Sequence, residues 1–193
     1  MPHDHDHDHD ENCNHDHDDS HGPLDYASPG KQLRLLIEES TIQIPGAPNA
    51  LYARLIQRMN YDAVYLSGAA FSASVFGLPD VGLFTLTELA QQTIYLTRTM
   101  TLPVIVDADT GFGEALNVER TIVELEAAGA AAIQLEDQVL PKRCGHLSGK
   151  TLVDTEAMCA KLRAAVGARS DPDTVIIART DARGVTNIDD ALV

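Results

Sequence analysis

Cysteine, tryptophan and basic side chains are scarce in this chain, which has three cysteines, no tryptophan, and 14 Lys and Arg against 29 Asp and Glu. Cys13, Cys144 and Cys159 are unevenly spaced and odd in number, so they do not form a disulfide framework and a reducing compartment is expected. The formal net charge of −15 at pH 7 disfavours nucleic acid and anionic membranes as partners, because both require a basic footprint. A small-molecule substrate is expected instead.

Long apolar runs are also absent, since no segment approaches the roughly 18 apolar residues of a membrane span. The start, Met1-Pro2-His3-Asp4, lacks the basic region and apolar core of a signal peptide, and its acidity contradicts an Arg-rich transit peptide. The sequence therefore predicts a soluble, cytoplasmic protein. Hydrophobic residues still make up 44% of the 193 residues, which is enough for one globular domain with a substantial core.

The first 22 residues are a low-complexity segment in which His and Asp alternate. Residues 1–21 hold eight acidic residues and seven of the eight histidines, which leaves 21 acidic residues against 14 Lys and Arg in the rest of the chain. A segment this polar cannot bury a core, so residues 1–22 are predicted to be a disordered tail. Its imidazole and carboxylate groups favour a transition metal, although a solvated tail with adventitious metal affinity is the simpler interpretation.

From Lys31 onward, short apolar runs alternate with helical segments, the pattern of repeated βα units. Thr85 and Glu88 form a capping-box signature, Gly129 closes a helix, and another helix extends from Asp154 to Gly167. The helices are predicted over 31–39, from about Asn49, over roughly 86–99, over 118–125 and over 154–167. The strands are predicted over 42–44, 63–66, 103–106, 131–135 and 174–178.

Near-continuous apolar strands between helices imply a parallel sheet that is buried on both faces. The regular repeat indicates an α/β fold of the (β/α)8 TIM-barrel family, which needs about 250 residues. About five βα units fit before a last helix, predicted to begin at Asn187, so residues 23–193 are predicted to form an incomplete, truncated barrel domain. An open five-stranded α/β sheet is the alternative, and an incomplete barrel leaves its edges exposed.

Reactive residues follow four of the five predicted strands, at the end where a barrel places its catalytic groups. The third strand ends in Asp107-Ala108-Asp109, so both carboxylates lie on one face and repel each other unless a cation lies between them. Magnesium, or manganese, is expected because these ions prefer oxygen ligands; a solvated turn is the simpler interpretation of the motif alone. The other strand ends are Tyr65-Leu66-Ser67-Gly68-Ala69, Glu136-Asp137 and Arg179-Thr180-Asp181.

A second group of reactive residues, Lys142-Arg143-Cys144-Gly145-His146, follows the fourth predicted strand. Three cationic or potentially cationic side chains around Cys144 favour its thiolate, which suits general acid catalysis toward a carbanion. Gly145 permits the close approach that a lid requires. A basic surface loop with an incidental cysteine is the alternative, and Cys159, inside a helical pattern, is predicted to be structural.

From about Ser28 to Val193 the sequence resembles the isocitrate lyase and phosphoenolpyruvate mutase superfamily. Five motifs carry the resemblance in the expected order: Tyr-Leu-Ser-Gly, Asp-Ala-Asp-Thr-Gly-Phe-Gly, Gln-Leu-Glu-Asp-Gln, Lys-Arg-Cys-Gly-His and Ala-Arg-Thr-Asp-Ala. The fourth motif is specific to the lyase branch, and the compact spacing resembles the 2-methylisocitrate lyases more than the isocitrate lyases. The resemblance implies a retro-Claisen-type cleavage, often described as a retro-aldol, of 2-methylisocitrate into pyruvate and succinate during propionate catabolism. It also implies a homo-oligomer, which is a tetramer in the family.

The resemblance implies a role for each matching residue. Asp107 and Asp109 would hold magnesium, with support from Asp80 and Glu136, and Cys144 would protonate the succinate carbanion. Other residues would contact the tricarboxylate substrate: Arg179 at the pyruvyl end, Tyr65 taking the hydroxyl proton, Ser67, Gly68 and Ala69 binding a carboxylate, and Gly145 and His146 beside the thiol. Ala69 stands where many relatives have glycine, which changes the shape of the pocket.

Two other functions remain open from the sequence. One is a different member of the superfamily, either an isocitrate lyase or a phosphonopyruvate-type or oxaloacetate-type enzyme, although the last two do not need the Cys144 thiol. The other is an inactive, truncated remnant whose His/Asp tail binds metal.

Overall fold

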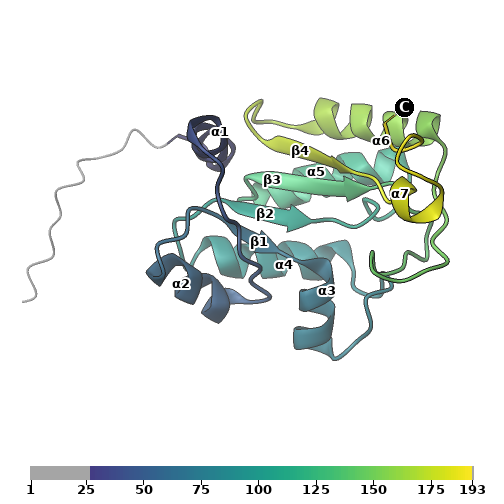
Figure 1. Cartoon of the computed structure of the whole chain (residues 1–193). Helices are drawn as coiled ribbons and strands as arrows, with labels where there is room; N and C mark the ends of the chain where they lie inside the picture. Colours follow the sequence, from purple (N-terminus) through teal and green to yellow (C-terminus); the bar gives the residue numbers. More distant parts are fainter. Residues whose placement is uncertain (1–26, 193) are drawn as a thin grey trace, which may run out of the picture.

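The computed structural model describes residues 27–192 (Figure 1). The predicted tail of residues 1–22, with its metal binding, lies outside the described residues. Four strands form one parallel sheet in the order β1-β2-β3-β4: Val64–Leu66, Val104–Asp107, Ala132–Glu136 and Val175–Arg179. The helices are α1 Pro29–Glu39, α2 Ala50–Arg58, α3 Gly68–Phe71, α4 Leu86–Thr97, α5 Ala115–Ala127, α6 Thr155–Ala168 and α7 Ala182–Val185, with a π-helix, η1, at Ser72–Phe76.

Most helix boundaries follow from the predicted caps. Thr85 and Glu88 make both hydrogen bonds of a capping box at the start of α4, and Asp154 accepts a hydrogen bond from the Ala157 N–H at the start of α6. Gly129 follows α5 with φ +90°, a backbone conformation that favours glycine. The predicted end of α6 at Gly167 is wrong, because the helix continues to Ala168 and Arg169 donates a side-chain hydrogen bond to the Val166 carbonyl.

The predicted first strand at residues 42–44 is absent from the sheet. The chain instead meets β1 at one bridge, between Gly46 and Tyr65, where the Ala47 N–H donates to the Tyr65 carbonyl at 2.8 Å. Pro45 accepts a hydrogen bond from the Tyr65 N–H but has no N–H of its own to extend the ladder. The sheet therefore has four strands in the described residues, and the extended segment before α2 lies along its β1 edge.

The helix that was predicted to begin at Asn187 is also wrong. The chain forms the short helix α7 earlier, and Asn187 then precedes a turn at residues 188–191, where its side-chain oxygen accepts a hydrogen bond from the Asp190 N–H. Asparagine favours such turns because its side chain binds nearby backbone groups. Across residues 27–192, no helix is long and apolar enough to cross a membrane.

The main core lies between one face of the sheet and the helices α4, α5 and α6. Val106 and Ile133 are fully buried there, together with Leu89 of α4 and Ile122 of α5. A smaller cluster on the other face joins Ile105 and Ala132 to Leu33 of α1. Figure 1 shows α1 beside the amino ends of the strands, and all four strands run from there toward α7. The carboxyl ends therefore meet at the opposite end of the sheet.

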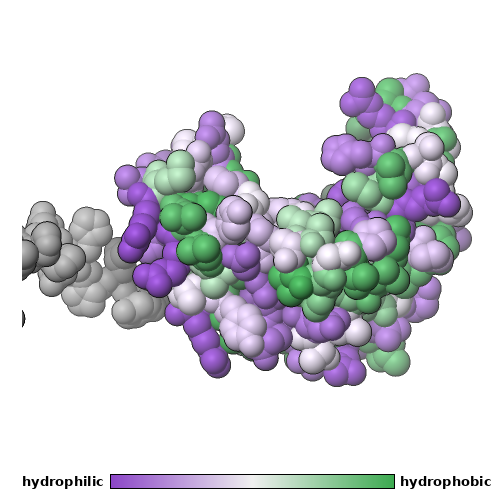
Figure 2. Space-filling view, turned by 90° about the horizontal axis from the view of Figure 1, so that it is seen from below, coloured by the Kyte–Doolittle hydropathy of each residue, from purple (hydrophilic) through white to green (hydrophobic). Residues whose placement is uncertain are grey.

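Apolar side chains also remain exposed on the outside. Leu51 and Leu55 lie one turn apart on α2 and are exposed, as is Met59 at its C-cap, while Ala53 and Ile56 on the same helix are buried. Seen from below, on the side where Figure 1 places α2, α3 and α4, the surface carries apolar patches between polar areas (Figure 2). The outer face of α2 is thus uncovered within the described residues.

Candidate active site

A cavity of about 310 Å³ opens at the carboxyl ends of the strands. It is lined by Tyr65, Ser67, Ala69, Asp80, Asp107, Glu136, Lys142, Cys144, Gly145, His146 and Arg179. Of the site residues predicted from the sequence, only Gly68 and Asp109 are absent from this lining. Both adjoin it, because the Gly68 N–H donates to Asp107 Oδ2 at 3.4 Å and the Asp109 N–H donates to Asp107 Oδ1 at 3.3 Å. The fold therefore brings all the predicted site residues together.

The strand register places the polar side chains of this cavity side by side. Residue pairing between β3 and β4 sets Glu136 opposite Arg179, and Arg179 Nη1 lies 3.5 Å from Glu136 Oε2. Asp107 ends β2, and the chain then turns through Asp109, whose φ of +49° is unusual for a residue other than glycine. Such strained backbone occurs often at functional sites, where the surrounding structure holds it.

Burial changes the protonation of two carboxyl groups in this cluster. Burial raises the pKa of Asp109 to about 6, although the nearby Lys142 ammonium acts in the opposite direction. Burial likewise raises the pKa of Glu136 to about 7, against the opposing charge of Arg179. Both groups therefore hold protons more tightly than free carboxyl groups, and an added cation would favour their ionised forms.

Lys142 belongs to the carboxylate cluster, which the sequence did not reveal. Its side chain is 4% exposed, and its ammonium contacts Asp80 and lies 2.7 Å from Asp109 Oδ1. We expected the Lys142 charge to act on Cys144. In the structure the Lys142 ammonium instead forms ion pairs with Asp80 and Asp109, at the Asp-x-Asp motif. The only sequence signal for the position of Lys142 was its place in the motif after β3. Sequence spacing does not give the direction in which a long side chain points.

The donor atoms of the cavity fit a hard divalent cation. Asp80, Asp107, Asp109 and Glu136 present carboxylate oxygens at or beside one cavity, and magnesium binds through one or two carboxylates while keeping water and substrate ligands. Among residues 27–192, no three His, Cys, Asp or Glu side chains form a ready-made metal cage. Oxygen donors of this kind suit magnesium, which needs few protein ligands.

Tyr65 faces the cavity as a protonated phenol. Its hydroxyl accepts a hydrogen bond from Gln134 Nε2 at 2.8 Å. Burial raises the pKa of Tyr65 well above its ordinary value, and the Asp107 charge and its hydrogen bond with the phenol act in the same direction. At neutral pH this side chain is therefore suited to donate a hydrogen bond, and the predicted role in removing a proton would need a second acceptor.

The loop between β3 and α6 carries Cys144 at the edge of the cavity. Cys144 is half-buried and His146 is exposed at the rim. Gly145 packs so closely on Arg179 that an added Cβ would lie 2.4 Å from Arg179 Nη2, so a larger residue would push the guanidinium aside. Cys159, by contrast, lies half-buried on α6 and does not line this cavity.

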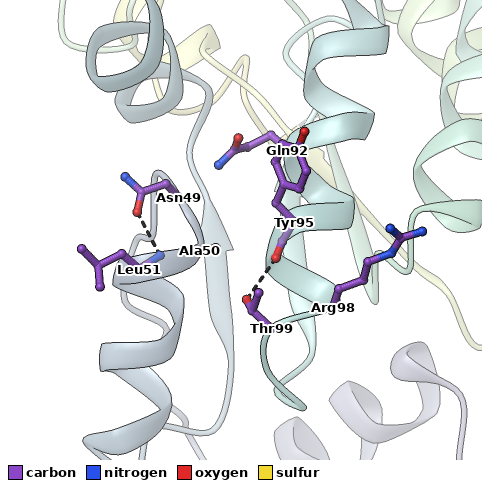
Figure 3. Close-up of a pocket in the computed structure, with 7 residues that line it drawn as sticks. All are labelled: Asn49, Ala50, Leu51, Gln92, Tyr95, Arg98 and Thr99. Carbon is purple, nitrogen blue, oxygen red and sulfur yellow. Dashed lines mark hydrogen bonds between the residues drawn. The ribbon is translucent and has the colours of Figure 1, made fainter.

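A larger hollow of about 650 Å³ lies elsewhere, between α2 and α4. Figure 3 shows Arg98 and Tyr95 on one side of it and Asn49 on the other. The Asn49 side chain is engaged in capping α2, and the Thr99 hydroxyl donates to the Tyr95 carbonyl. This hollow contains no carboxylate, cysteine or histidine, so the smaller cavity remains the better candidate for chemistry.

A parallel α/β sheet with its charged cavity at the carboxyl ends of the strands defines a protein of the TIM-barrel class. The chain belongs to the phosphoenolpyruvate phosphomutase family, whose family model matches residues 33–192. The family resemblance predicted from the five motifs is therefore confirmed.

Named relatives support this membership. The chain is 59% identical over 165 residues to 2-methylisocitrate lyase from Aeropyrum pernix. The aligned region covers 85% of this chain and 53% of that protein. The structure is similar to a crystal structure of 2,3-dimethylmalate lyase, with a TM-score of 0.81 and 39% identity, over 86% of this chain and 57% of the other. This match confirms the predicted α/β fold.

A third similar structure bears on the metal. Phosphonopyruvate hydrolase in complex with oxalate and Mg²⁺ matches with a TM-score of 0.74 and 33% identity, covering 81% of this chain and 53% of that chain. In all these comparisons, the chain spans about half the length of the relatives it matches.

Proposed function

We propose that this protein is a magnesium-dependent carbon-carbon lyase that cleaves 2-methylisocitrate into pyruvate and succinate. The observation that carries the proposal is that Cys144, Arg179 and Asp107, which come from three separate segments, line one cavity at the carboxyl ends of the strands. A cation site, a carboxylate-binding guanidinium and a thiol are the groups that such a cleavage requires. The identity to a 2-methylisocitrate lyase supports this choice of substrate.

Substrate binding in this proposal uses the polar groups along the cavity wall. Arg179 binds the carboxylate at the pyruvyl end, where its guanidinium offers several hydrogen-bond donors. The Ser67 oxygen already accepts a hydrogen bond from the Ala70 N–H, which leaves its hydroxyl proton free for a second substrate carboxylate. Ala69 borders this position and limits its size, and Gly145 and His146 close the opposite side.

The carboxylate pair holds the metal in this proposal. Asp107 and Asp109 would bind magnesium, and the carboxylates of Asp80 and Glu136 would support this site. When bound, the ion supplies positive charge beside the oxygen atoms of the 2-hydroxy acid. The substrate hydroxyl donates a hydrogen bond to the Tyr65 oxygen, and as that oxygen takes the hydroxyl proton its own proton passes to Asp107, which accepts the Tyr65 hydrogen bond.

Cys144 completes the reaction in this proposal. The hydroxyl proton leaves, the carbon-oxygen double bond of pyruvate forms, and the electron pair of the broken carbon-carbon bond passes to the succinate fragment. The Cys144 thiol then gives its proton to that carbanion, and its thiolate is neutralised when the next proton enters from solvent. Arg179, held between Glu136 and Asp181, keeps the opposite end of the substrate fixed during this step.

A second substrate has a specific observation in its favour. The solved structure of 2,3-dimethylmalate lyase is similar over 86% of this chain, so 2,3-dimethylmalate is the second candidate. In either case we infer a cytoplasmic homo-oligomer that acts on a small carboxylate substrate, and metal binding by residues 1–22 stays a separate prediction.

A substrate panel tests this proposal. The purified chain is assayed for release of the 2-oxo acid, which is pyruvate from 2-methylisocitrate and 2,3-dimethylmalate and glyoxylate from isocitrate, each with magnesium and with excess chelator. Magnesium-dependent release that is fastest with 2-methylisocitrate is the expected result. Preference for 2,3-dimethylmalate, which yields propionate and pyruvate, would replace the first substrate by the second. No release from any of the three by soluble, folded protein would reject lyase activity and favour the inactive remnant.

A further inference from the structure

The loop that carries Cys144 is tied at its base. Gln138 and Leu152 form an antiparallel bridge, and on either side of it the Val139 N–H donates to the Thr151 carbonyl and the Val153 N–H donates to the Asp137 carbonyl, each at 2.8 Å. The two ends of the loop, at residues 137–139 and 151–153, are therefore held side by side by backbone hydrogen bonds. Such a base alone would still allow the loop tip to swing away from the cavity.

Two buried side chains hold the backbone on each side of the cysteine. Gln138, 1% exposed, accepts a hydrogen bond from the Arg143 N–H and donates to the Arg143 carbonyl, both at 2.9 Å. Lys150, whose side chain is 5% exposed, donates to the Gly145 carbonyl at 2.6 Å. The residues immediately before and after Cys144 are thus fixed by groups that do not face the substrate.

Both side chains converge on one carboxylate from a different strand. Gln138 Nε2 donates to Asp181 Oδ2 at 2.8 Å, and Lys150 Nζ donates to Asp181 Oδ1 at 2.9 Å. Asp181 follows β4, and its own N–H donates to Asp137 Oδ1 at 3.0 Å. One buried carboxylate of the segment after β4 therefore holds both side chains that fix the Cys144 loop.

We propose that Asp181, Lys150 and Gln138 are positioning residues that keep the Cys144 loop folded over the cavity and thereby set where the thiol lies. Charged groups this deeply buried need partners, so loss of either partner leaves the other uncompensated and favours local opening. Burial acts to raise the pKa of Asp181, but the Lys150 hydrogen bond and the Arg179 charge outweigh it and hold this pKa below its usual range. Asp181 is therefore ionised in the folded protein and able to bind Lys150.

Thiol labelling tests this proposal without any need for turnover. A chain with Cys13→Ser and Cys159→Ser retains Cys144 as its only cysteine, and its rate of reaction with iodoacetamide reports access to the loop. In this background Lys150→Met and Asp181→Asn should each label at least about tenfold faster, because each removes a charge-assisted hydrogen bond that closes the loop. Arg120→Met is the control, since this side chain is 70% exposed on α5 and pairs with Glu124 of the same helix at 3.6 Å, and it should change the rate by less than about twofold.

The two variants also separate loop opening from a change in thiol electrostatics. Removing a cation beside the cysteine disfavours its thiolate, and removing an anion favours it, so an electrostatic effect alone would slow Lys150→Met and accelerate Asp181→Asn. Opening of the loop accelerates both. The acceleration in the double variant should be smaller than the product of the two single accelerations, because both single variants remove the Lys150–Asp181 contact.

Hydrogen exchange distinguishes a positioning role from general destabilisation. We expect faster exchange in the amides of residues 143–150 and unchanged exchange in β3. Unchanged labelling in both single variants, opposite changes in the two, or equal acceleration in β3 and the loop would each overturn the proposal. The role of Cys144 rests on the proposed lyase function, but labelling and exchange remain informative if the substrate assay shows no activity.

Discussion

One strand of this protein runs through two regions that are buried to the same extent and are chemically opposite. Ile133 and Leu135 of β3 pack in the apolar core and are 0% and 1% exposed, while Glu136 at the end of the same strand is 2% exposed and faces charged groups. Apolar burial stabilises the fold by about 1.5 to 3 kcal/mol for each large side chain, whereas a buried carboxylate costs free energy unless it is paired. The apolar residues of the sheet thus stabilise the fold, whereas the buried charged residues at its carboxyl ends do not contribute to stability in the same way and point to a function.

The largest expected effect that separates the two regions is on turnover. Asp107→Ala should lower magnesium-dependent pyruvate release by about 10³-fold, because charge stabilisation by the metal is worth several kcal/mol. The same change removes a buried carboxylate from a like-charged cluster and leaves the Gly68 and Asp109 N–H groups without their acceptor, so the free energy of unfolding should change by less than about 2 kcal/mol. Turnover and urea unfolding of the same preparation measure both. A marked loss of stability without loss of turnover would show that Asp107 is a structural residue.

The reverse effect is expected in the apolar region. Ile133→Ala removes a fully buried side chain between β3 and the helices and should lower the free energy of unfolding by about 2–5 kcal/mol. The turnover of the protein that remains folded should not change. Urea denaturation and active-site titration check this, with Val123→Ala as the matched control because Val123 is 53% exposed on α5. Equal losses in both variants would contradict the assignment of this core.

A smaller effect concerns pH. The pKa of Asp109 is raised to about 6 and that of Glu136 to about 7, so the folded protein holds protons that the unfolded chain releases nearer pH 4. Their contribution to stability is therefore fully present below about pH 4 and is lost as the pH rises to about 7. The loss without metal amounts to several kcal/mol, since a pKa difference of one corresponds to about 1.4 kcal/mol.

Unfolding measured at pH 5 and pH 8 in chelator checks this sign, and added magnesium should restore part of the loss at pH 8. Glu136→Gln, which cannot ionise, should show a smaller difference between the two pH values. If the wild-type protein became more stable toward pH 8 and the Glu136→Gln variant behaved identically, the burial of these carboxylates would not control its pH dependence.

Much of this arrangement was predictable because it depends on local chemistry. The two-residue period of Asp107-Ala108-Asp109 predicts two carboxylates on one face, and the Thr85 capping box predicts the start of α4. The apolar residues 42–44 predicted a first strand that the sheet does not contain. Its absence could not be predicted from these residues, because Pro45 limits the pairing of this segment with β1 to one bridge. The carboxylate pair and the capping box each lie within a few residues of the chain, whereas the bridge joins residues 46 and 65.

The contacts that hold the site together were harder to predict. Lys142 reaches Asp80, which is 62 residues away in the chain, and Gln138 reaches Asp181, which is 43 residues away. No local pattern gives the direction of such side chains, because the strand order and the path of each loop decide which groups meet. The sequence therefore predicts which residues lie at the carboxyl ends, and the tertiary structure decides their partners.

The central claim is that the carboxyl ends of this sheet form a lyase site in which Cys144 is the proton donor. The most direct measurement is the rate of pyruvate release from 2-methylisocitrate with magnesium, for the wild-type chain, Cys144→Ser and the control Cys159→Ser. We expect Cys144→Ser to fall by at least about 10²-fold, as for the loss of a general acid, and Cys159→Ser to match the wild type. Wild-type rates in Cys144→Ser would contradict the claim.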